Sequence, residues 1–313
     1  MKFSITIPTY KKKYLAEAIE SVLSQTYSDF ELIIVNDASP ENIDSIISQY
    51  NDTRIKYFKN KYNCGAINVV DNWNICLEHA SGEFLICMGD DDKLLPNCLE
   101  EYNQLIKKYP SLAIYHGRTE IIDENSHFYK VTSQRPEFET VYSLIWHRWT
   151  GRTQFIGDFL FNVQYLRQVK GFYKLPLAWA SDDISAVISA SLNGIANTQK
   201  IVFQYRENAK SITNSGNAKV KIDAIEQEFN WYKCFLATNI PADEENIKFK
   251  QSVKILFPKH FLKKKIHTIS KDLCDCHFTS VIYWAKRYKK YRLTASQFAY
   301  CLIDGLKKCM TKS

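Results

Sequence analysis

Long apolar segments are missing from this chain of 313 residues, which contains no run of 18 or more apolar residues. A helix needs about 20 consecutive apolar residues to cross a bilayer, so we expect no membrane-spanning segment. Internal repeats and low-complexity segments are missing as well. The hydrophobic content of 45% and the charged content of 24% are ordinary for a soluble globular protein.

A second Cys/His pair at zinc spacing is also missing. Cys274, Cys276 and His277 stand close together, but alone they form at most half of a structural zinc site, so we expect no zinc. The nine cysteines are odd in number and scattered, and Cys87 lies inside an apolar run. This usage is typical of reduced thiols, so we expect a cytoplasmic protein.

Positive charge is concentrated near the C-terminus. Residues 219–313 hold 19 Lys and Arg against 9 Asp and Glu, a net charge of +10, whereas residues 1–218 carry a net charge of −3. We therefore expect a catalytic domain over 1–218 and a basic, mainly helical region over 219–313. No recognised nucleic-acid-binding module accompanies the basic residues, so we expect no nucleic-acid partner.

Apolar periodicity predicts alternating strands and helices over the first 92 residues. Strands are predicted at 3–7 (ending at Pro8), 30–35, 55–58 and 84–88, and helices at 15–23, 43–50 and 69–77. This alternation is typical of a parallel sheet with right-handed crossovers, so we expect an α/β fold. Further on, helices are predicted at 95–108, 165–169 and 184–193, strands at 112–115, 155–161 and 201–205, and an irregular, aromatic-rich stretch at 117–155.

Polar residues follow three of the predicted strands. They are Thr9 and Tyr10, Asp37, and the triplet Asp90, Asp91 and Asp92. Ligands of parallel sheets bind beyond the carboxyl ends of the strands, so we expect these residues to converge on one crevice. Adjacent carboxylates repel one another unless a cation joins them, and a divalent ion could bridge them to a substrate phosphate. The alternative is a solvated acidic turn in which Asp92 caps the helix near Leu95.

A second acidic pair, Asp182 and Asp183, precedes the predicted helix 184–193. One interpretation is an N-cap with a favourable helix-dipole interaction. The other is a general base that accepts a proton from a hydroxyl group. A metal-binding carboxylate cluster together with such a base would suit the transfer of a group from a nucleotide diphosphate.

Four ordered segments, Ile5–Tyr10, Ala18–Tyr27, Glu31–Ser39 and Gly89–Pro96, closely resemble the family-two glycosyltransferases. The resemblance is strong over residues 3–100 and weaker over 155–212. It implies the GT-A fold, a mostly parallel nucleotide-binding sheet flanked by helices, with a helical C-terminal appendage. Residues 1–100 would form the nucleotide-binding half and residues 101–218 the acceptor-binding half.

The resemblance also implies residue roles. Pro8, Thr9 and Tyr10 would lie against the nucleoside, and Asp37 would bind the uracil ring. Asp92, together with Asp91, would hold manganese or magnesium on the diphosphate, while Asp91 or Asp90 would contact the ribose. Asp183, with Asp182 in place of the usual Glu, would be the catalytic base of an inverting displacement. Asn208 stands where many members have a metal-binding His, so the ligand set departs from the family pattern.

The implied function is an inverting glycosyltransferase that moves a sugar from a UDP-sugar to a hydroxyl of a glycan or lipid-linked acceptor. A sugar nucleotidyltransferase is an alternative, but Pro8–Lys13 contains no glycine for a phosphate loop. A non-catalytic nucleotide- or glycan-binding module is a second alternative.

Basic and aromatic residues are mixed at Phe261–Ile266 and Trp284–Arg292. They form either a solvated helical face or, as we expect, a peripheral contact of residues 260–292 with an anionic membrane at its cytoplasmic face.

Overall fold

The computed structural model describes residues 2–208, 217–241, 243–274 and 278–310. The chain divides into two compact units, one made of residues 1–174 and 180–211 and the other of residues 175–179 and 212–313. Cys276 and His277, which belong to the Cys/His cluster considered above, lie outside the described residues.

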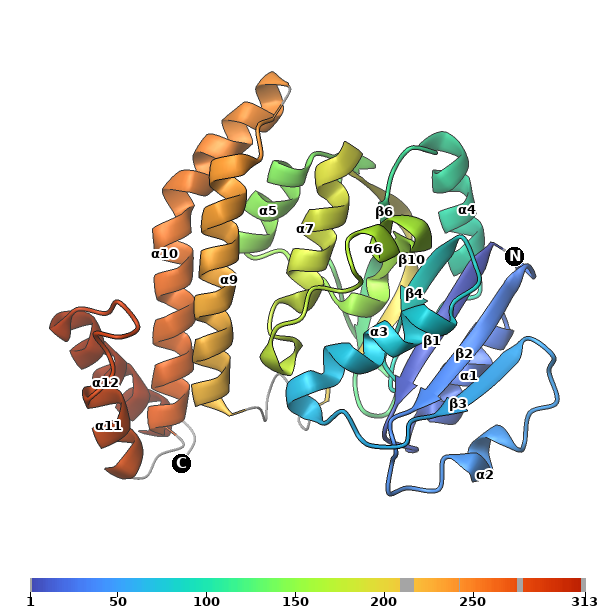
Figure 1. Cartoon of the computed structure of the whole chain (residues 1–313), viewed down its shortest axis with the longest axis horizontal. Helices are drawn as coiled ribbons and strands as arrows, with labels where there is room; N and C mark the ends of the chain where they lie inside the picture. Colours follow the sequence, from blue (N-terminus) through green and yellow to red (C-terminus); the bar gives the residue numbers. More distant parts are fainter. Residues whose placement is uncertain (1, 209–216, 242, 275–277, 311–313) are drawn as a thin grey trace. The chain divides into compact units, whose positions relative to one another are not determined.

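The first unit has the predicted α/β architecture, built on a sheet with the strand order β3-β2-β1-β4-β9-β6-β10-β5 (Figure 1). The strands are β1 (Phe3–Thr9), β2 (Phe30–Asn36), β3 (Ile55–Lys59), β4 (Phe84–Cys87), β5 (Lys93–Leu94), β6 (Ile114–Ile122), β7 (Phe128–Val131), β8 (Phe138–Glu139), β9 (Phe159–Asn162) and β10 (Ile195–Arg206). Strands β3, β2, β1 and β4 run parallel, and β10 is parallel to β6. Because β9 is antiparallel to both β4 and β6, the carboxyl ends of β4 and β6 lie at the same edge.

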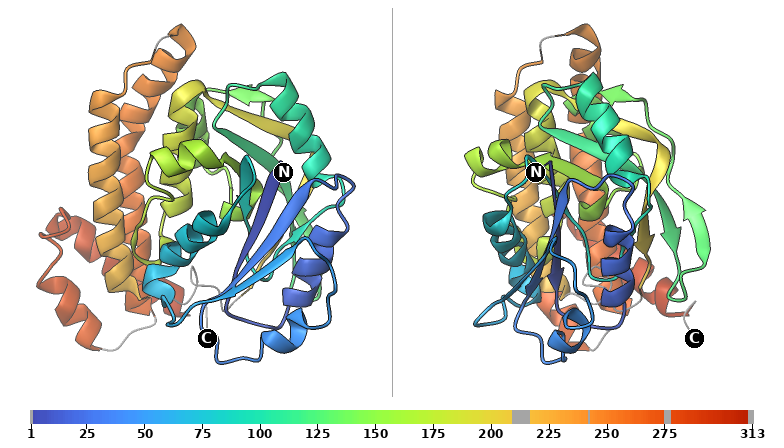
Figure 2. Two further views of the ribbon diagram at one scale, coloured as in Figure 1. Left: turned by 45° about the vertical axis from the view of Figure 1, so that its right-hand side comes forward. Right: turned by 90° about the vertical axis from the view of Figure 1, so that its right-hand side faces the viewer.

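Helices cover both faces of this sheet. They are α1 (Leu15–Leu23), α2 (Asp44–Ile47), α3 (Val69–His79), α4 (Cys98–Lys108), α5 (Val141–Trp149), α6 (Val163–Gln168) and α7 (Ser181–Asn193). Figure 2 shows α1 and α3 on opposite sides of β1 and β2. Strand β2 is buried along its whole length, which explains its continuous apolar sequence. Helix α1 instead buries Leu15, Ile19 and Val22, which recur at helical spacing.

Strand β1 continues through Pro8, where the sequence predicted its end. The pairing of β1 with β4 stops at Thr6 opposite Cys87, whereas its pairing with β2 continues to Thr9 opposite Asn36. Pro8 therefore lies beyond the last paired residue of β4, where its missing N–H removes no ladder hydrogen bond.

The stretch 117–155 was predicted to be irregular, and this prediction was wrong. It contains most of β6, the hairpin strand β7, β8 and helix α5. Apolar periodicity fails here because polar side chains are buried. Thr119 and His116 of β6 are both inside the unit, and Thr119 donates a hydrogen bond to the buried carboxylate of Asp158.

Two other boundaries differ from the prediction in ways that matter for the site. Helix α7 begins at Ser181, three residues before the predicted start. Asp182 and Asp183 therefore belong to its first turn and are not N-caps. Strand β10 begins at Ile195 and ends at Arg206, which places Arg206 at the same edge as the acidic triplet.

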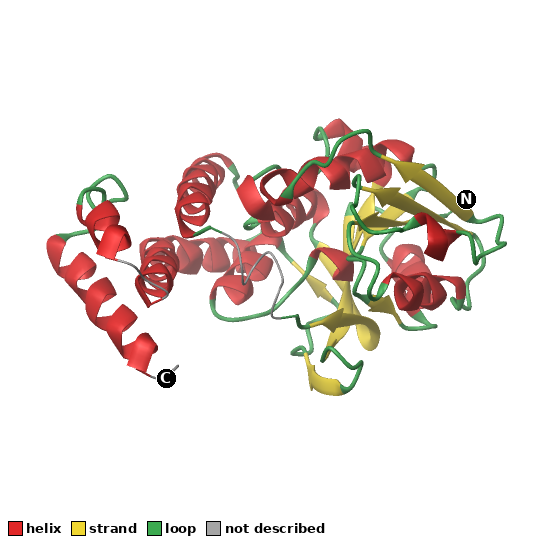
Figure 3. Ribbon diagram, turned by 90° about the horizontal axis from the view of Figure 1, so that it is seen from below, coloured by secondary structure: helices red, strands yellow, loops and turns green. Residues whose placement is uncertain are grey.

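The second unit has the predicted helical character. It contains α9 (Ala218–Thr238), α10 (Glu244–Cys274), α11 (Phe278–Ala285) and α12 (Ala295–Met310), shown in red in Figure 3. Phe229, Phe257 and Phe261 bring α9 and α10 together, with ring centroids 4.7 to 5.3 Å apart. Among the described residues, no helix combines the length and apolar character that a membrane crossing requires.

Much of the basic, aromatic segment 260–292 is used inside this helical unit. Phe261, Trp284 and Tyr291 are buried. Lys264 pairs with Glu228, Lys265 with Glu226, and Arg292 with Glu226. These residues stabilise the packing of the helices, so the segment offers less to an external surface than its composition indicated.

Candidate functional site

The segment that follows β1 is held by Asp90. Its Oδ2 accepts hydrogen bonds from the Thr9 hydroxyl at 3.1 Å, from the Tyr10 backbone N–H at 2.8 Å and from the Lys11 backbone N–H at 2.9 Å. Burial raises the pKa of Asp90, and these hydrogen bonds oppose the rise. Asp90 thus anchors the loop that carries Tyr10, a residue that is 44% exposed at the edge of the sheet.

Asp91 and Asp92 converge above Gly89. A Cβ atom placed on Gly89 would lie 2.9 Å from Oδ1 of Asp91 and 3.0 Å from Oδ2 of Asp92. Asp92 is only 4% exposed, and burial followed by the charge of Asp91 raises its pKa well above the ordinary value. Burial, together with the charge of Asp90, raises the pKa of Asp91 to about 6. Two carboxylates held together this closely attract a cation.

Arg206 fixes the position of this acidic pair, and sequence reasoning did not assign it a role. Its backbone N–H donates to Oδ1 of Asp92 at 3.0 Å, and its Nε donates to the carbonyl of Asp91 at 2.8 Å. The same guanidinium donates to Glu17 of α1 and to Ser126 after β6. Arg206 therefore connects the acidic pair to both flanks of the sheet edge.

Asp37 lies at the end of β2 and is buried. Its Oδ1 accepts hydrogen bonds from the Asn60 side chain and from the Cys64 backbone N–H, both at 2.9 Å. Asn63 donates to the Asp37 carbonyl at 2.7 Å. This polar cluster holds the Asp37 carboxylate at the same edge as Tyr10, because Thr9 and Asn36 are paired neighbours in β1 and β2.

Asp183 is held by side chains from two other segments. Its Oδ1 accepts a hydrogen bond from Arg148 Nε of α5 at 2.7 Å and from Gln154 Nε2 at 2.8 Å. Burial, and then the charge of Asp183, raise the pKa of the adjacent Asp182 to about 7. Donated hydrogen bonds favour the charged form of a carboxylate. Asp183 therefore has two donors that stabilise a carboxylate, whereas burial favours the protonated form of Asp182.

Tyr205 links the two acidic groups. Its ring stacks on Phe155, with centroids 3.7 Å apart, and its pKa is raised by burial and then by the charges of Asp92, Asp91, Glu207 and Asp182. Asp91 and Asp92 of the triplet and Asp182 of α7 are thus all close enough to Tyr205 for their charges to affect its pKa.

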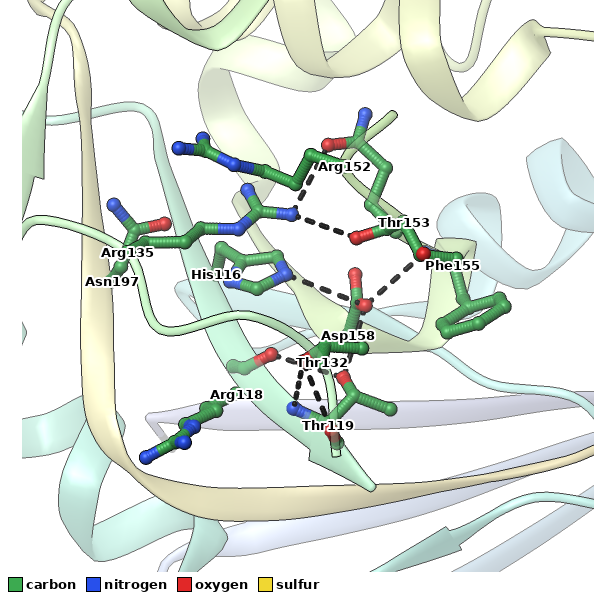
Figure 4. Close-up of polar contacts among 12 residues, drawn as sticks. His116, Arg118, Thr119, Thr132, Arg135, Arg152, Thr153, Phe155, Asp158 and Asn197 are labelled. Atoms are coloured by element: carbon green, nitrogen blue, oxygen red, sulfur yellow. Dashed lines mark hydrogen bonds and ion pairs between the residues drawn. The ribbon is translucent and has the colours of Figure 1, made fainter. Parts of the chain in front are cut away.

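A network of buried polar residues, which includes His116, Arg135 and Asp158 (Figure 4), was also missed by sequence reasoning. Glu139 accepts two hydrogen bonds from Arg152, at 2.8 and 2.7 Å. Asp158 lies 3.4 Å from His116. Glu139 and Arg152 belong to the stretch that was expected to be irregular, His116 and Asp158 lie just outside it, and their scattered charges form no motif. In the sequence, this buried network could have been suspected only from the unusual number of charged residues close to predicted strands.

The residues present are suited to a divalent cation shared with a substrate. Within the described ranges, no group of three His, Cys, Asp or Glu side chains is arranged to enclose a metal. Asp91 and Asp92 supply two converging oxygens instead. Magnesium-type ions are often held by one or two carboxylates and completed by substrate phosphates and water. The donor set therefore fits a metal that binds together with a diphosphate.

Replacing Gly89 with alanine should test this convergence. The three atoms nearest to the new Cβ belong to the side chains of Asp91 and Asp92, so the chain should fold while the two carboxylates shift away from position 89 by a few tenths of an ångström. We expect metal-dependent nucleotide binding to weaken by roughly tenfold, the size of loss seen when metal ligands are misplaced. Calorimetric titration would measure it, and an unchanged affinity would contradict a shared metal site.

Similarity to known proteins agrees with this geometry. The family model for Glycosyl transferase family 2 matches residues 4–169. The chain is 34% identical over 124 residues to the Escherichia coli UDP-Glc:alpha-D-GlcNAc-diphosphoundecaprenol beta-1,3-glucosyltransferase WfgD, a match covering 39% of this chain and 47% of WfgD. It is 38% identical over 107 residues to the Campylobacter jejuni GalNAc(5)-diNAcBac-PP-undecaprenol beta-1,3-glucosyltransferase, covering 33% of this chain and 34% of that enzyme. The chain thus spans less than half the length of these relatives.

Solved structures share the fold. S. aureus TarS 1-349 in complex with UDP-GlcNAc superposes with a TM-score of 0.66 at 14% identity, covering 100% of this chain and 91% of that one. The mannosyltransferase PcManGT from Pyrobaculum calidifontis, in complex with GDP-Man and Mn2+, superposes with a TM-score of 0.54 at 15% identity, covering 100% and 88%. These neighbours confirm the predicted GT-A fold. Since the family model covers more than half of the sequence, the chain belongs to glycosyl transferase family 2.

Proposed function

We propose that this enzyme transfers a sugar from a UDP-sugar to a hydroxyl group of a lipid-linked glycan, with inversion at the anomeric carbon. The observation that carries this proposal is the convergence of the Asp91 and Asp92 carboxylates at the carboxyl edge of the sheet, together with an Asp183 carboxylate that accepts hydrogen bonds from Arg148 and Gln154. The relatives named for UDP-glucose or for undecaprenol-linked acceptors support the choice of donor and acceptor.

In this proposal the donor lies along the carboxyl edge of the sheet. Asp37 accepts a hydrogen bond from the uracil ring, and Pro8, Thr9 and Tyr10 lie against the nucleoside. Asp90 contributes indirectly, by holding the loop that carries Tyr10. Asp91 and Asp92 hold manganese or magnesium. The bound ion would neutralise charge that develops on the leaving diphosphate.

The chemical step is a single in-line displacement. The acceptor oxygen attacks the anomeric carbon as the bond from that carbon to the diphosphate oxygen breaks, and the acceptor proton passes to Asp183. Arg148 and Gln154 each donate a hydrogen bond to Asp183, which favours the ionised form that a base requires. Asp182 carries its own proton more readily, so it limits the negative charge beside the base.

The two alternatives are less well supported. A nucleotidyltransferase would use basic residues and glycines after the first strand to hold a triphosphate, but Lys11 to Lys13 follow β1 without a glycine. A non-catalytic module has no need for a base held by two donors as Asp183 is. Measured sugar transfer would exclude this second alternative.

Titration with UDP tests the donor site directly. Calorimetry should show binding of UDP that strengthens when manganese is present, and a screen of UDP-sugars should then show which one is hydrolysed slowly in the absence of acceptor. Absence of UDP binding under both conditions would contradict the proposed donor. Binding of GDP in preference to UDP would keep the fold and reassign the nucleotide.

We also propose that residues 1–218 carry catalysis and that residues 219–313 attach the enzyme to the cytoplasmic face of an anionic membrane. Because much of segment 260–292 is used in packing the helices together, we propose that α12 makes the membrane contact. The outward side of α12 carries Tyr300, Ile303, Leu306 and Met310, which are exposed, while Phe298, Cys301 and Gly305 are buried on the opposite side. An apolar stripe on a region with a net charge of +10 suits an anionic bilayer.

Replacing Ile303 with glutamate should weaken this attachment. Losing the burial of one isoleucine costs about 1.5–3 kcal/mol, so we expect co-flotation with phosphatidylglycerol vesicles to fall roughly tenfold or more. Leu192→Glu is the matched control, because Leu192 is an exposed leucine of α7 in the other unit. Equal flotation of Ile303→Glu and the unsubstituted protein would exclude α12 as the contact.

A further inference from the structure

The amide of Gln154 is directed toward Asp183 by a second residue. Arg135 Nη2 lies 3.3 Å from Oε1 of Gln154 and 3.2 Å from the carbonyl of Thr153. A guanidinium only donates hydrogen bonds, so the group of Gln154 that faces Arg135 must be its oxygen. Its NH2 group then points to Asp183, which it reaches at 2.8 Å.

Arg135 is itself held deep inside the first unit. Its residue is 5% exposed, and its Nη1 lies 3.9 Å from Glu139. Burial lowers the pKa of Arg135 to about 10, whereas the charges of Asp158 and Glu139 oppose this change. Figure 4 shows its side chain extending above His116 toward the segment that contains Thr153.

The carboxylates of Glu139 and Asp158, which lie near Arg135, are themselves held by hydrogen bonds. Glu139 accepts hydrogen bonds from Arg152, Asn197 and Ser143. Asp158 accepts hydrogen bonds from Thr119 at 3.0 Å and from the Phe155 backbone N–H at 3.1 Å. The positions of both acids are therefore set by β6, β8 and β10 and by the segment before β9, which makes Arg135 a rigid donor.

We propose that Arg135 and Gln154 form a positioning relay that fixes the orientation of the Asp183 carboxylate and keeps it ionised. This inference rests on the proposed role of Asp183 as the base. Neither relay residue contacts the reacting atoms in it. Arg135 orients the amide of Gln154, and the amide then donates a hydrogen bond to Oδ1 of Asp183.

The charges around Asp183 determine the direction of the expected effect. Arg148 of α5 and the NH2 group of Gln154 donate to Oδ1, and both favour the ionised form. Asp182 on the same helix opposes ionisation, and Asp158 adds negative charge near the pair. Losing the Gln154 donor should therefore raise the pKa of Asp183 and move the acid limb of activity to higher pH.

Replacing Gln154 with glutamate tests the relay. Two carboxylates about as close as the present 2.8 Å contact cannot both ionise. We expect the acid-limb midpoint of kcat/KM to rise by about one pH unit or more, with the KM for the donor changed less than twofold. Carboxyl NMR of protein labelled with carbon-13 in its aspartates, assigned with Asp183→Asn, should show the same rise.

Gln25→Glu is the matched control. Gln25 is 7% exposed and Gln154 is 4% exposed, and both amides donate from Nε2 and accept at Oε1. Gln25 holds the helix α4 start, so its substitution should lower the melting temperature without moving the midpoint. If Gln154→Glu does not fold, Gln154→Met removes both bonds at similar size, and Arg135→Lys should produce a smaller shift in the same direction.

These experiments test the relay of Arg135 and Gln154 independently of the proposed sugar transfer. An unchanged Asp183 titration in Gln154→Glu or Gln154→Met overturns the relay, even in an active enzyme. A shifted titration supports it even if the unsubstituted protein transfers no sugar, in which case the proposed function fails separately.

Discussion

Replacing Asp183 with asparagine should reduce kcat by roughly 10³-fold, within the range that general base catalysis contributes. The amide has nearly the shape of the carboxylate, so it can keep contacts with Arg148 and Gln154, but it cannot take the acceptor proton. Donor binding should change little, because Asp183 belongs to α7 and not to the strand ends where we propose that the nucleotide binds. Initial rates with donor and acceptor varied separately would show the loss in kcat alone.

Asp182→Asn provides the comparison. Burial and the charge of Asp183 already favour the protonated form of Asp182, with a pKa of about 7. Its neutral amide analogue should therefore retain most activity near pH 7. A larger loss in Asp182→Asn than in Asp183→Asn would assign the base to Asp182, and full activity in Asp183→Asn would remove the base from α7 altogether.

Replacing Asp92 with asparagine should abolish the dependence of UDP binding on manganese. Asp92 is the most buried of the triplet, and its Oδ2 lies with Oδ1 of Asp91 on the same side of Gly89. Loss of a direct ligand should weaken metal affinity by at least about 100-fold, the upper end of losses caused by second-shell changes. Titration with UDP, with and without manganese, would show a residual metal-independent affinity only.

Asp92→Asn should weaken metal-dependent UDP binding but should not lower the stability of the fold. In the metal-free protein, Asp92→Asn removes a buried charge that Asp91 repels, so the melting temperature should stay equal or rise. Asp90→Asn should instead lower it, because Asp90 accepts three hydrogen bonds after β1. Asp52→Asn, at a residue whose side chain is 26% exposed and pairs with Arg54, controls for the change in net charge. Manganese-dependent binding that persists in Asp92→Asn would place the metal elsewhere.

Local sequence patterns were sufficient to predict the alternating strands and helices of residues 1–92. The strands at Phe3, Phe30, Ile55 and Phe84 are short apolar runs separated by helical stripes, and each formed close to its expected bounds. Parallel strands place their carboxyl ends at one edge, so Asp37 and the triplet could be brought together without coordinates. The family was readable for the same reason, because its motifs are contiguous in sequence.

Side-chain roles within the triplet depended on tertiary contacts. The sequence offers three equivalent aspartates, but only Asp90 meets the Tyr10 and Lys11 backbone N–H groups, and only Asp92 meets the Arg206 backbone N–H. These partners lie about 80 and 114 residues away along the chain. Local sequence patterns therefore cannot predict which of the three carboxylates binds each of these backbone N–H groups.

By itself, the sequence determined the alternation of strands and helices, the α/β fold, the family and the acidic edge of the sheet, because these follow from apolar periodicity and contiguous motifs. Only the tertiary structure decided that Arg148 and Gln154 hold Asp183, that Arg206 holds the acidic pair, and that polar residues of β6 are buried. Those contacts join segments distant in sequence. Their polar side chains can be buried only where folding supplies hydrogen-bond partners, which periodicity cannot register.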